Sequence, residues 1–332
     1  MKKIKFLIVR FSSIGDIVLT TPVVRTLKQQ VEHSEIHFVT KAQYKPLLEH
    51  NPYIDQLHIF DGSFKNLAQS LSNIDFDYII DLHKNLRSLR VKRLLKRVSF
   101  SFDKLNFQKW LYVTFKWNKL PDVHIVDRYM ATTKPFDVKN DGKGLDYFFS
   151  PQCVIPESFK SFKEDYLGVV LGANHATKQI PENLMVNIIE QVNKPVVLLG
   201  GAKEVEHAAR LESKLNVKTL NTCGNTTFDD SAYLLSRANV VLTPDTGMMH
   251  IAAALNKPIV SMWGNTVPRF GMYPYMKDGG APSFIAEVEQ LKCRPCSKIG
   301  YAKCPKNHFN CMMKQDVNQI VKNILSYWNI HD

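Results

Sequence analysis

The chain has 332 residues, of which 45% are hydrophobic and 22% are charged, and its net charge is +12. This length suits two domains of about 150 residues each. The apolar content excludes a disordered chain, and no stretch approaches the roughly 20 apolar residues that a membrane-spanning helix needs.

The first half of the chain alternates predicted strands with predicted helices. Residues 4–10 are expected to form a strand rather than a secretory signal, because the apolar run is short and no small-residue cleavage site follows. Alternation of strands with helices of roughly 10–15 residues predicts a parallel sheet with helices on both faces. The other elements expected here are a helix over 17–30 and strands over 36–40, 56–60 and 78–81.

A polar motif follows the first strand, where a parallel sheet presents side chains to ligands. Asp16 lies at a helix start, where backbone N–H groups favour an ionised carboxylate. Such a carboxylate suits a general base that deprotonates a sugar hydroxyl, but a simple helix cap fits equally well, and both roles stay open. The motif lacks dinucleotide-binding glycine spacing, which disfavours a nicotinamide or flavin cofactor. It comprises Arg10, Phe11, Ser12, Ser13, Ile14, Gly15 and Asp16.

Basic residues concentrate in residues 84–119, which contain eleven Lys or Arg and one acid. This charge points to an acidic partner, such as nucleic acid, anionic lipid or a phosphorylated substrate, and a solvated surface is the simpler alternative. Arg90, Arg93 and Arg97 recur at spacings of three and four, which predicts one basic helix face. Four aromatic residues follow and suit either a membrane interface or a core: Trp110, Tyr112, Phe115 and Trp117.

The alternation restarts after residues 150–165, which interrupt all periodicity. We therefore expect an α/β fold of two Rossmann-like, doubly wound domains that face a cleft, at 1–155 and 156–332. The second domain includes a Cys-rich loop over 293–311. Its expected strands are 167–171, 195–200, 217–221, 240–243 and 258–262, and its expected helices are 182–192, 204–214, 228–236, 247–255 and a C-terminal helix over 315–329.

Two strand-end loops of the second half form a candidate phosphate site. Thr246 and Gly247 open a helix, and the free N–H groups at a helix N-terminus bind anions such as pyrophosphate. Lys178 precedes another helix and is suited to pair with a diphosphate. Ordinary alternatives exist for each residue: Asp245 with Thr246 forms a common N-cap, His250 suits a core, and Lys178 suits an exposed surface.

As a set, these motifs resemble those of the bacterial heptosyltransferases of lipopolysaccharide assembly, glycosyltransferase family 9. The resemblance covers most of the chain in the same order and spacing. It rests on Ser12-Ser13-Ile14-Gly15-Asp16, Lys178-Gln179-Ile180-Pro181, Gly200-Gly201-Ala202, Asp245-Thr246-Gly247 with His250, and Trp263-Gly264-Asn265-Thr266 with Pro268.

The resemblance implies a GT-B architecture, with an acceptor-binding first domain and a donor-binding second domain. It also implies inverting, metal-independent transfer of heptose from ADP-heptose to an inner-core acceptor, either Kdo-lipid A or a heptosylated core, without a cofactor. By the same resemblance Asp16 is the base. The implied acceptor-binding residues are Ser12, Ser13, Gly15, Lys84, Arg87 and Arg90. The implied donor-binding residues are Thr177, Lys178, Glu204, Asp245, Thr246, Gly247 and His250.

Other functions stay open from the sequence. A family member that uses another nucleotide sugar, or a nucleotide-sugar epimerase, would share the architecture, and a strict need for an acceptor would separate the epimerase. Nucleic-acid binding is disfavoured, because no RNA- or DNA-binding signature is present. We expect a cytoplasmic monomer that binds an anionic glycolipid, with peripheral contact to the inner membrane as an open alternative.

The cysteines of the loop over 293–311 leave three alternatives. Four thiolates suit a structural zinc ion, whereas disulfide pairing or a reduced loop fits the same spacing. No metal is expected at the catalytic site, and glycosyl transfer requires no thiol. The residues are Cys293, Cys296, Cys304 and Cys311.

Overall fold

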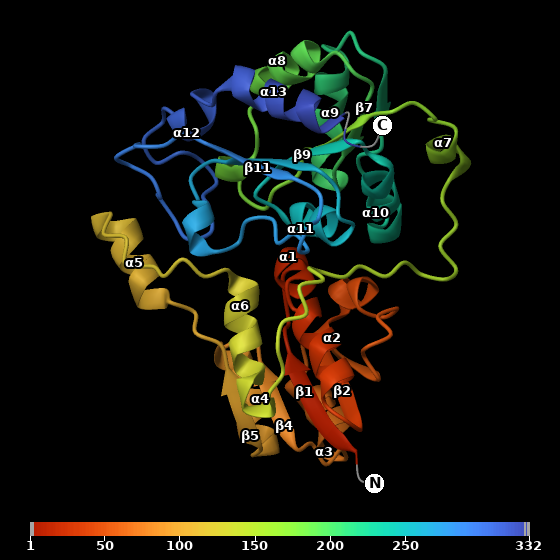
Figure 1. Ribbon diagram of the computed structural model, residues 1–332, viewed down its shortest axis with the longest axis vertical. Coiled ribbons are helices and arrows are strands. Elements are labelled where there is room, and N and C mark those ends of the chain that lie inside the picture. The colour runs from red at the N-terminus through yellow and green to blue at the C-terminus, as the bar shows by residue number, and fades with distance from the viewer. Residues whose placement is uncertain (1–2, 329, 331–332) are drawn as a thin grey trace. The chain divides into compact units, whose positions relative to one another are not determined.

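The computed structural model describes residues 3–328 and 330. The chain forms two compact units, one of Met1–Lys104 with Val123–Pro151 and the other of Leu105–Asp122 with Gln152–Asp332. Each unit contains one parallel sheet with helices packed on it (Figure 1), which confirms the expected α/β class. Among the described residues, no helix combines the length and apolarity that crossing a bilayer requires.

The first unit is built on a five-stranded sheet in the order β3-β2-β1-β4-β5. β1 (Ile4–Val9) is central and pairs in parallel with β2 (Ser34–Lys41) and β4 (Tyr78–Asp81). The chain moves outward through β2 to β3 (Gln56–Phe60), and then returns to the other side of β1 through β4 and β5 (Val98–Ser101). The strand order therefore reverses between β1 and β4.

Local sequence explains where the helices of the first unit begin and end. The helix expected over 17–30 is two helices, because Pro22 lacks an N–H and starts a new helix at its first turn. The expected basic face is shorter than predicted: Lys96 adopts a φ of 51°, so the helix ends before Arg97. The helices are α1 (Ile14–Val18), α2 (Thr21–Gln30), α3 (Phe64–Ser72), α4 (Leu86–Leu95) and α6 (Ile125–Met130), with 3-10 helices at Ala42–Leu47 and Ala131–Phe136.

The second unit is built on a six-stranded parallel sheet in the order β11-β10-β9-β6-β7-β8. The chain enters at β6 (Leu167–Val170), moves outward to β8, and returns to the other side of β6 at β9 (Val240–Pro244). The strand order reverses between β6 and β9. The remaining strands are β7 (Val196–Leu199), β8 (Thr219–Asn221), β10 (Ile259–Trp263) and β11 (Ser283–Glu287).

Five helices of the second unit correspond to the expected ones: α8, α9, α10 and α11, and the C-terminal α13. That last helix was expected to end at residue 329, which lies outside the described residues. The helices are α5 (Asn106–Phe115), α7 (Glu157–Lys160), α8 (Glu182–Val192), α9 (Val205–Glu212), α10 (Phe228–Arg237), α11 (Gly247–Ala254), α12 (Asn310–Met313) and α13 (Val317–Trp328), with 3-10 helices at Ala176–Lys178, Ala202–Glu204 and Pro268–Phe270.

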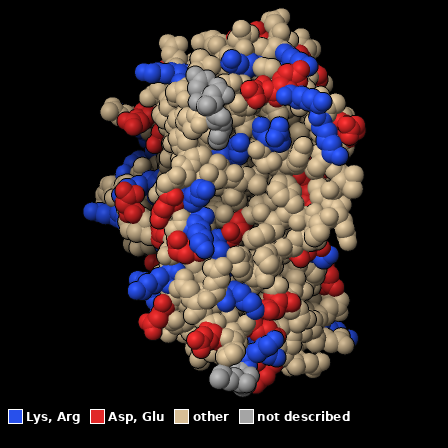
Figure 2. Space-filling model, turned by 45° about the vertical axis from the view of Figure 1, so that its right-hand side comes forward, with Lys and Arg blue, Asp and Glu red and all other residues tan. Residues whose placement is uncertain are grey.

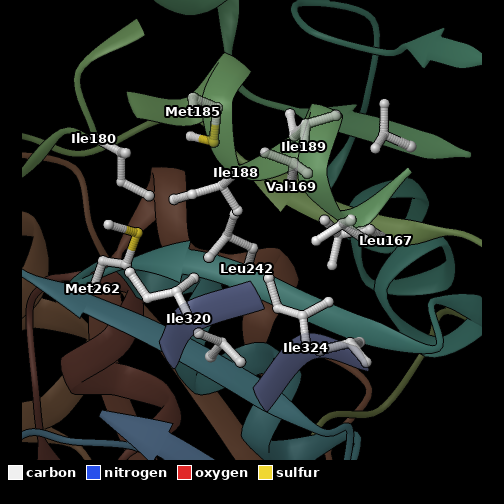
Figure 3. Close-up of a cluster of buried hydrophobic side chains, with 14 of the residues drawn as sticks. Leu167, Val169, Ile180, Met185, Ile188, Ile189, Leu242, Met262, Ile320 and Ile324 are labelled. Atoms are coloured by element: carbon white, nitrogen blue, oxygen red, sulfur yellow. The ribbon is translucent and has the colours of Figure 1, made fainter. Parts of the chain in front are cut away.

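One core of the second unit lies between its sheet and two helices (Figure 3). Leu167 and Val169 point from β6 toward Ile188 of α8, while Ile320 and Ile324 of α13 cover the neighbouring surface. All five are fully or almost fully buried. Removal of this apolar area from water stabilises the unit and fixes the sheet whose strand ends carry the candidate site.

The segment 105–122 differs from the expected domain division, which placed it in the first domain. The structure groups it with the second unit. The reason is packing: Leu105 and Leu120 form a buried apolar cluster with Val267 and Phe270, and the Tyr112 ring lies 6.2 Å from that of Phe270. These contacts join residues far apart in the sequence, which no local periodicity reports.

Candidate active site

The candidate residues of the first unit come from two loops at the β1–β4 reversal. The first loop follows β1 and carries Asp16, and the second follows β4 and carries Lys84. In open α/β sheets, ligands bind beyond the carboxyl ends of the strands at such a reversal. Arg90 lies farther along α4. The other residues that the sequence assigned to the base and to the acceptor lie in or beside these two loops: Ser12, Ser13, Gly15, Asp16, Lys84 and Arg87.

Asp16 is paired with an almost fully buried arginine. Arg10 Nη2 lies 2.7 Å from Asp16 Oδ2, and the Ser13 hydroxyl donates to the same oxygen at 2.8 Å. Burial acts to raise the pKa of the Asp16 carboxyl, but the Arg10 charge and the Ser13 hydrogen bonds outweigh it and lower that pKa. Asp16 is therefore ionised at neutral pH, as a general base must be.

Asp16 also caps α1. The Ser13 backbone N–H donates to Asp16 Oδ2 at 3.3 Å, in addition to the hydroxyl contact. Both contacts lie within the first turn of the helix. The capping role that the sequence left open is thus present, and it is compatible with an ionised carboxylate one-fifth exposed to solvent.

The sequence did not identify the role of Arg10 or its other partners. Arg10 Nη1 donates to the Leu82 carbonyl and, at 3.0 Å, to the Tyr129 hydroxyl, while Nε donates to the Ser12 carbonyl at 2.6 Å. These bonds hold the guanidinium group between β1, the loop after β4 and α6. Arg10 belonged to the quoted motif, but no local pattern marked Tyr129.

Asp81, the last residue of β4, organises the loop that carries Lys84. Its carboxylate accepts from the N–H of Lys84 at 2.7 Å, from the N–H of His83 at 3.0 Å and from the hydroxyl of Ser88 at 2.9 Å. Lys92 Nζ lies 3.0 Å from the same carboxylate. This fully buried acid was not identified from the sequence, although its position at a strand end was a signal.

The basic residues assigned to the acceptor are exposed. Lys84, Arg87 and Arg90 all face solvent, and the Arg90 guanidinium lies 5.2 Å from the centre of the Phe64 ring. Burial lowers the pKa of His83 to about 4, and the nearby charges of Arg10 and Lys104 act in the same direction. His83 is therefore neutral at pH 7, so the positive charge of this loop comes from its Lys and Arg residues.

In the second unit, two candidate residues form an ion pair across the β6–β9 reversal. Lys178 follows β6, Asp245 follows β9, and Lys178 Nζ lies 2.6 Å from Asp245 Oδ2. Thr266, after β10, donates its hydroxyl to the same oxygen at 2.8 Å. Thr246 and Gly247, which directly follow Asp245 in the sequence, form the N-terminus of α11. A cation and a helix N-terminus therefore lie at one strand-end edge, which is an arrangement that binds phosphates.

His250 and Glu204 also belong to this edge. His250 is buried on the first turns of α11. Glu204 Oε2 accepts from the Gly201 N–H at 2.9 Å, and a Cβ at Gly200 would lie 2.7 Å from the Cβ of Glu204. The glycine therefore permits the close approach of Glu204 to the strand end. Glu204 lines a pocket of about 400 Å³ with Gln179, among other residues.

Thr177, which the sequence analysis expected to bind the donor, makes two side-chain hydrogen bonds within the protein. Its side chain is buried, its hydroxyl donates to the Tyr301 carbonyl at 3.0 Å, and it accepts from the Tyr301 N–H at 2.8 Å. These bonds tie the loop after β6 to the Cys-rich loop. The hydroxyl of Thr177 is thus engaged with the protein in this structure.

The Cys-rich loop contains free thiols in this structure. Burial raises the pKa of Cys296 and that of Cys311 to about 11. The neighbouring Cys293 also raises the pKa of Cys296. Cys296 and Cys311 are therefore both protonated at neutral pH. Within the described part of the chain, no group of three or more His, Cys, Asp or Glu side chains is arranged to hold a metal ion.

Comparison with known proteins adds independent evidence. Residues 64–299 match the model of glycosyltransferase family 9 (heptosyltransferase). The chain is 26% identical over 322 residues to lipooligosaccharide heptosyltransferase 2 of Haemophilus influenzae, covering 89% of this chain and 92% of that protein.

Two solved structures share the fold. The glycosyl transferase family 9 protein of Veillonella parvula has a TM-score of 0.76 at 19% identity, covering 98% of this chain and 97% of that one. The E. coli heptosyltransferase WaaC with ADP has a TM-score of 0.71 at 20% identity, covering 98% of this chain and 100% of that one. Both match this chain over nearly its whole length.

Proposed function

The chain belongs to glycosyltransferase family 9, the heptosyltransferase family, and on that premise we propose that it transfers heptose from ADP-heptose to an anionic inner-core lipopolysaccharide acceptor. The family and the enzyme class expected from the motifs are thereby confirmed, and the fold is the GT-B type of the solved heptosyltransferases. The observation that carries the proposal is that Asp16 and Lys84 in the first unit, and Lys178 and Asp245 in the second, follow the strands that flank the strand-order reversals.

In the proposed reaction, Asp16 is the general base. Its carboxylate accepts the proton of an acceptor hydroxyl while that oxygen forms a bond to the anomeric carbon of the heptose. The bond from this carbon to the diphosphate oxygen breaks, and ADP leaves from the opposite side, so the anomeric configuration inverts. The lowered pKa of Asp16, kept low by Arg10, supports this role because the base form is present throughout the neutral range.

The proposed donor site uses protein charge to stabilise the departing diphosphate. Lys178 supplies a cation, and the N-terminus of α11 at Thr246 and Gly247 supplies N–H groups. These groups would take the place that a divalent cation occupies in metal-dependent transferases, which is why we propose a metal-independent transfer. Glu204 and its pocket are proposed to bind the ribose, and Asp245 and His250 to complete the site, with Thr177 supporting the loop.

The proposed acceptor site lies on the first unit. Exposed Lys84, Arg87 and Arg90 suit carboxylates and phosphates of an inner-core glycolipid, while Ser12, Ser13 and Gly15 form the loop beside Asp16. The two units supply both candidate sites from one chain, so we propose a monomer. Because such an acceptor is assembled on its lipid anchor, we propose action at the cytoplasmic face of the inner membrane.

A panel of nucleotide sugars tests this function. Purified protein is incubated with ADP-heptose, other ADP sugars and UDP sugars, with and without a Kdo-lipid A or heptosylated acceptor, and both released nucleotide and glycolipid mass are measured. We expect ADP release and one added heptose only when acceptor is present. UDP release with an added hexose would favour the alternative donor, and sugar conversion without acceptor would favour an epimerase.

A further inference from the structure

The helix α5 presents an aromatic surface that the transfer reaction does not use. None of its ten residues, all of them within the described part of the chain, is buried. In Figure 1, α5 lies apart from the strands of the second sheet. Four rings along α5 and just after it are 45 to 65% exposed, and we call them the aromatic patch: Phe107, Trp110, Phe115 and Trp117.

The rings of the aromatic patch contact one another in a continuous row. The Phe107 and Trp110 rings are stacked with centroids 6.0 Å apart, and Phe115 lies 5.4 Å from both Trp110 and Trp117. In contrast, Tyr112 packs on Phe270 and anchors the helix. The patch is thus a preformed apolar surface rather than a set of isolated exposed side chains.

The patch is continuous with the Cys-rich loop. Lys298 Nζ donates to the Asn106 carbonyl at 3.2 Å, and Lys116 Nζ donates to the Pro295 carbonyl at 2.7 Å. Ile299, which follows Lys298 in this loop, is 64% exposed. The anchored loop therefore extends the apolar surface and gives α5 a fixed position on the second unit.

Both segments that form this surface are basic. Residues 105–119 contain three lysines and no acid, and residues 290–315 contain six Lys or Arg and no acid. On the face that Figure 2 shows, basic and acidic side chains are intermixed. Acids lie just outside the two segments: Arg294 pairs with Glu287, and Glu287 and Glu289 line a pocket with Tyr112 and Lys116, so the excess of basic residues is confined to the segments themselves.

We propose that the aromatic patch and its lysines dock the protein on an anionic lipid bilayer. Trp and Phe side chains favour the membrane–water interface, and lysines beside them pair with anionic headgroups while their methylene chains lie on apolar surface. A nucleic acid would use the charges but would leave Phe107 and Ile299 in water. The inference does not depend on the proposed reaction, because bilayers without acceptor test it.

Intrinsic fluorescence provides a direct test. The chain has four tryptophans, of which Trp263 and Trp328 are buried, so quenching by lipid reports on Trp110 and Trp117. Vesicles of phosphatidylcholine with phosphatidylglycerol, brominated at defined acyl positions and free of acceptor, are titrated into the full chain. We expect strongest quenching from the shallowest bromines and weak binding to phosphatidylcholine alone. Raising salt to about 1 M should weaken binding, because screening shortens the reach of the lysines.

Variants locate the surface. Trp110→Ser with Trp117→Ser should weaken binding to anionic vesicles roughly tenfold or more, since affinity scales with buried apolar area. Val154→Ser, which changes an 83% exposed apolar residue outside the patch, is the matched control and should bind normally. Lys303 and Lys306 are exposed lysines of the Cys-rich loop, and Lys303→Gln with Lys306→Gln should weaken binding. Lys65→Gln with Lys160→Gln changes two exposed lysines outside both segments and should not weaken it.

Melting temperatures establish that each variant folds. If the double serine variant does not fold, the single variants Trp110→Phe and Trp117→Phe each leave one tryptophan of the patch, whose quenching by lipid can still be measured. The proposal is overturned by absent binding to anionic vesicles. It is also overturned by binding without quenching of the tryptophans, which would place the lipid contact elsewhere. Tight binding to RNA with none to vesicles would overturn it in favour of a nucleic-acid surface.

Discussion

Lys178 Nζ lies 2.6 Å from Asp245 Oδ2, so one ion pair joins the loops that follow β6 and β9. The cation proposed to bind the donor diphosphate is therefore held in place before the donor arrives. Such preorganisation matters because a charge that is already oriented stabilises the leaving group without further rearrangement. It also means that the diphosphate and Asp245 share the positive charge of Lys178 in the bound state.

Replacing Lys178 with Ala should lower kcat/KM for the donor by about 10²- to 10³-fold, the usual loss when one charge-stabilising group is removed. Steady-state kinetics and donor titration measure this effect. Lys28→Ala is the matched control, because Lys28 Nζ also lies 2.6 Å from a carboxylate, that of Asp55, away from the strand-order reversals. Equal rates in the two variants would remove Lys178 from the donor site.

The pairing of Arg10 with Asp16 predicts the pH dependence of the reaction. Because the pKa of Asp16 is lowered, its carboxylate persists as pH falls, and activity should decline only below the ordinary value near 3.8. In Arg10→Gln, burial is no longer opposed by that charge, so the acid limb of kcat/KM should move upward by about 1–3 pH units. Arg10→Lys retains the charge and should keep the limb low. Identical profiles for the two variants would contradict this assignment.

The same pairing links pH to stability. A carboxyl whose pKa is lowered on folding contributes stability above its unfolded pKa, and this contribution is lost as pH falls through the folded value. For Asp16 the loss is expected below its ordinary pKa near 3.8. Thermal melts from neutral pH into this range should show a smaller acid-dependent fall in Arg10→Gln than in the wild type.

Much of the fold could be predicted because local patterns determine it. The strands at Gln56–Phe60 and Tyr78–Asp81 and the helix at Glu182–Val192 have the bounds that apolar periodicity and turn residues indicated. The strand β5 was missed, because the expected basic helix face was continued through Arg97, although Val98 and Phe100 alternate with serines as in a half-buried strand. The position of α5 depends on distant packing partners, which a local pattern cannot report.

The candidate site was predictable to the extent that it follows strand ends. Asp16, Lys178 and Asp245 were identified because each lies in a loop or at a helix start that follows a buried strand, where a parallel sheet presents side chains to ligands. The interactions that tune them were not predictable. Arg10 reaches Tyr129 across 119 residues of sequence, and this contact exists only once the sheet and α6 have formed.

The exposed arginines of the first unit predict a salt-dependent acceptor interaction. Arg87→Gln with Arg90→Gln should raise the acceptor KM, more at low salt than at high salt, because screening weakens exposed charges. Donor affinity should change little. Arg97→Gln with Arg237→Gln removes the same charge from exposed positions outside the β4 loop and should leave the acceptor KM near normal. An equal effect of both pairs would assign the result to net charge alone.

The role of Asp16 is tested by Asp16→Asn, compared with Asp230→Asn as a matched control. Asp230 caps α10 with the same geometry, since the Thr227 N–H and hydroxyl donate to its Oδ2 at 2.9 and 2.8 Å. Both variants retain an oxygen that can accept these capping bonds, but Asp16→Asn also removes the counter-charge of buried Arg10, so its melting temperature should fall further. If Asp16 is the base, turnover of the folded protein should drop by about 10²- to 10⁴-fold, with donor affinity unchanged. Asp230→Asn should keep normal turnover. Should Asp16→Asn also turn over normally once folded, the carboxylate serves only as a cap and ion-pair partner, and the base lies elsewhere.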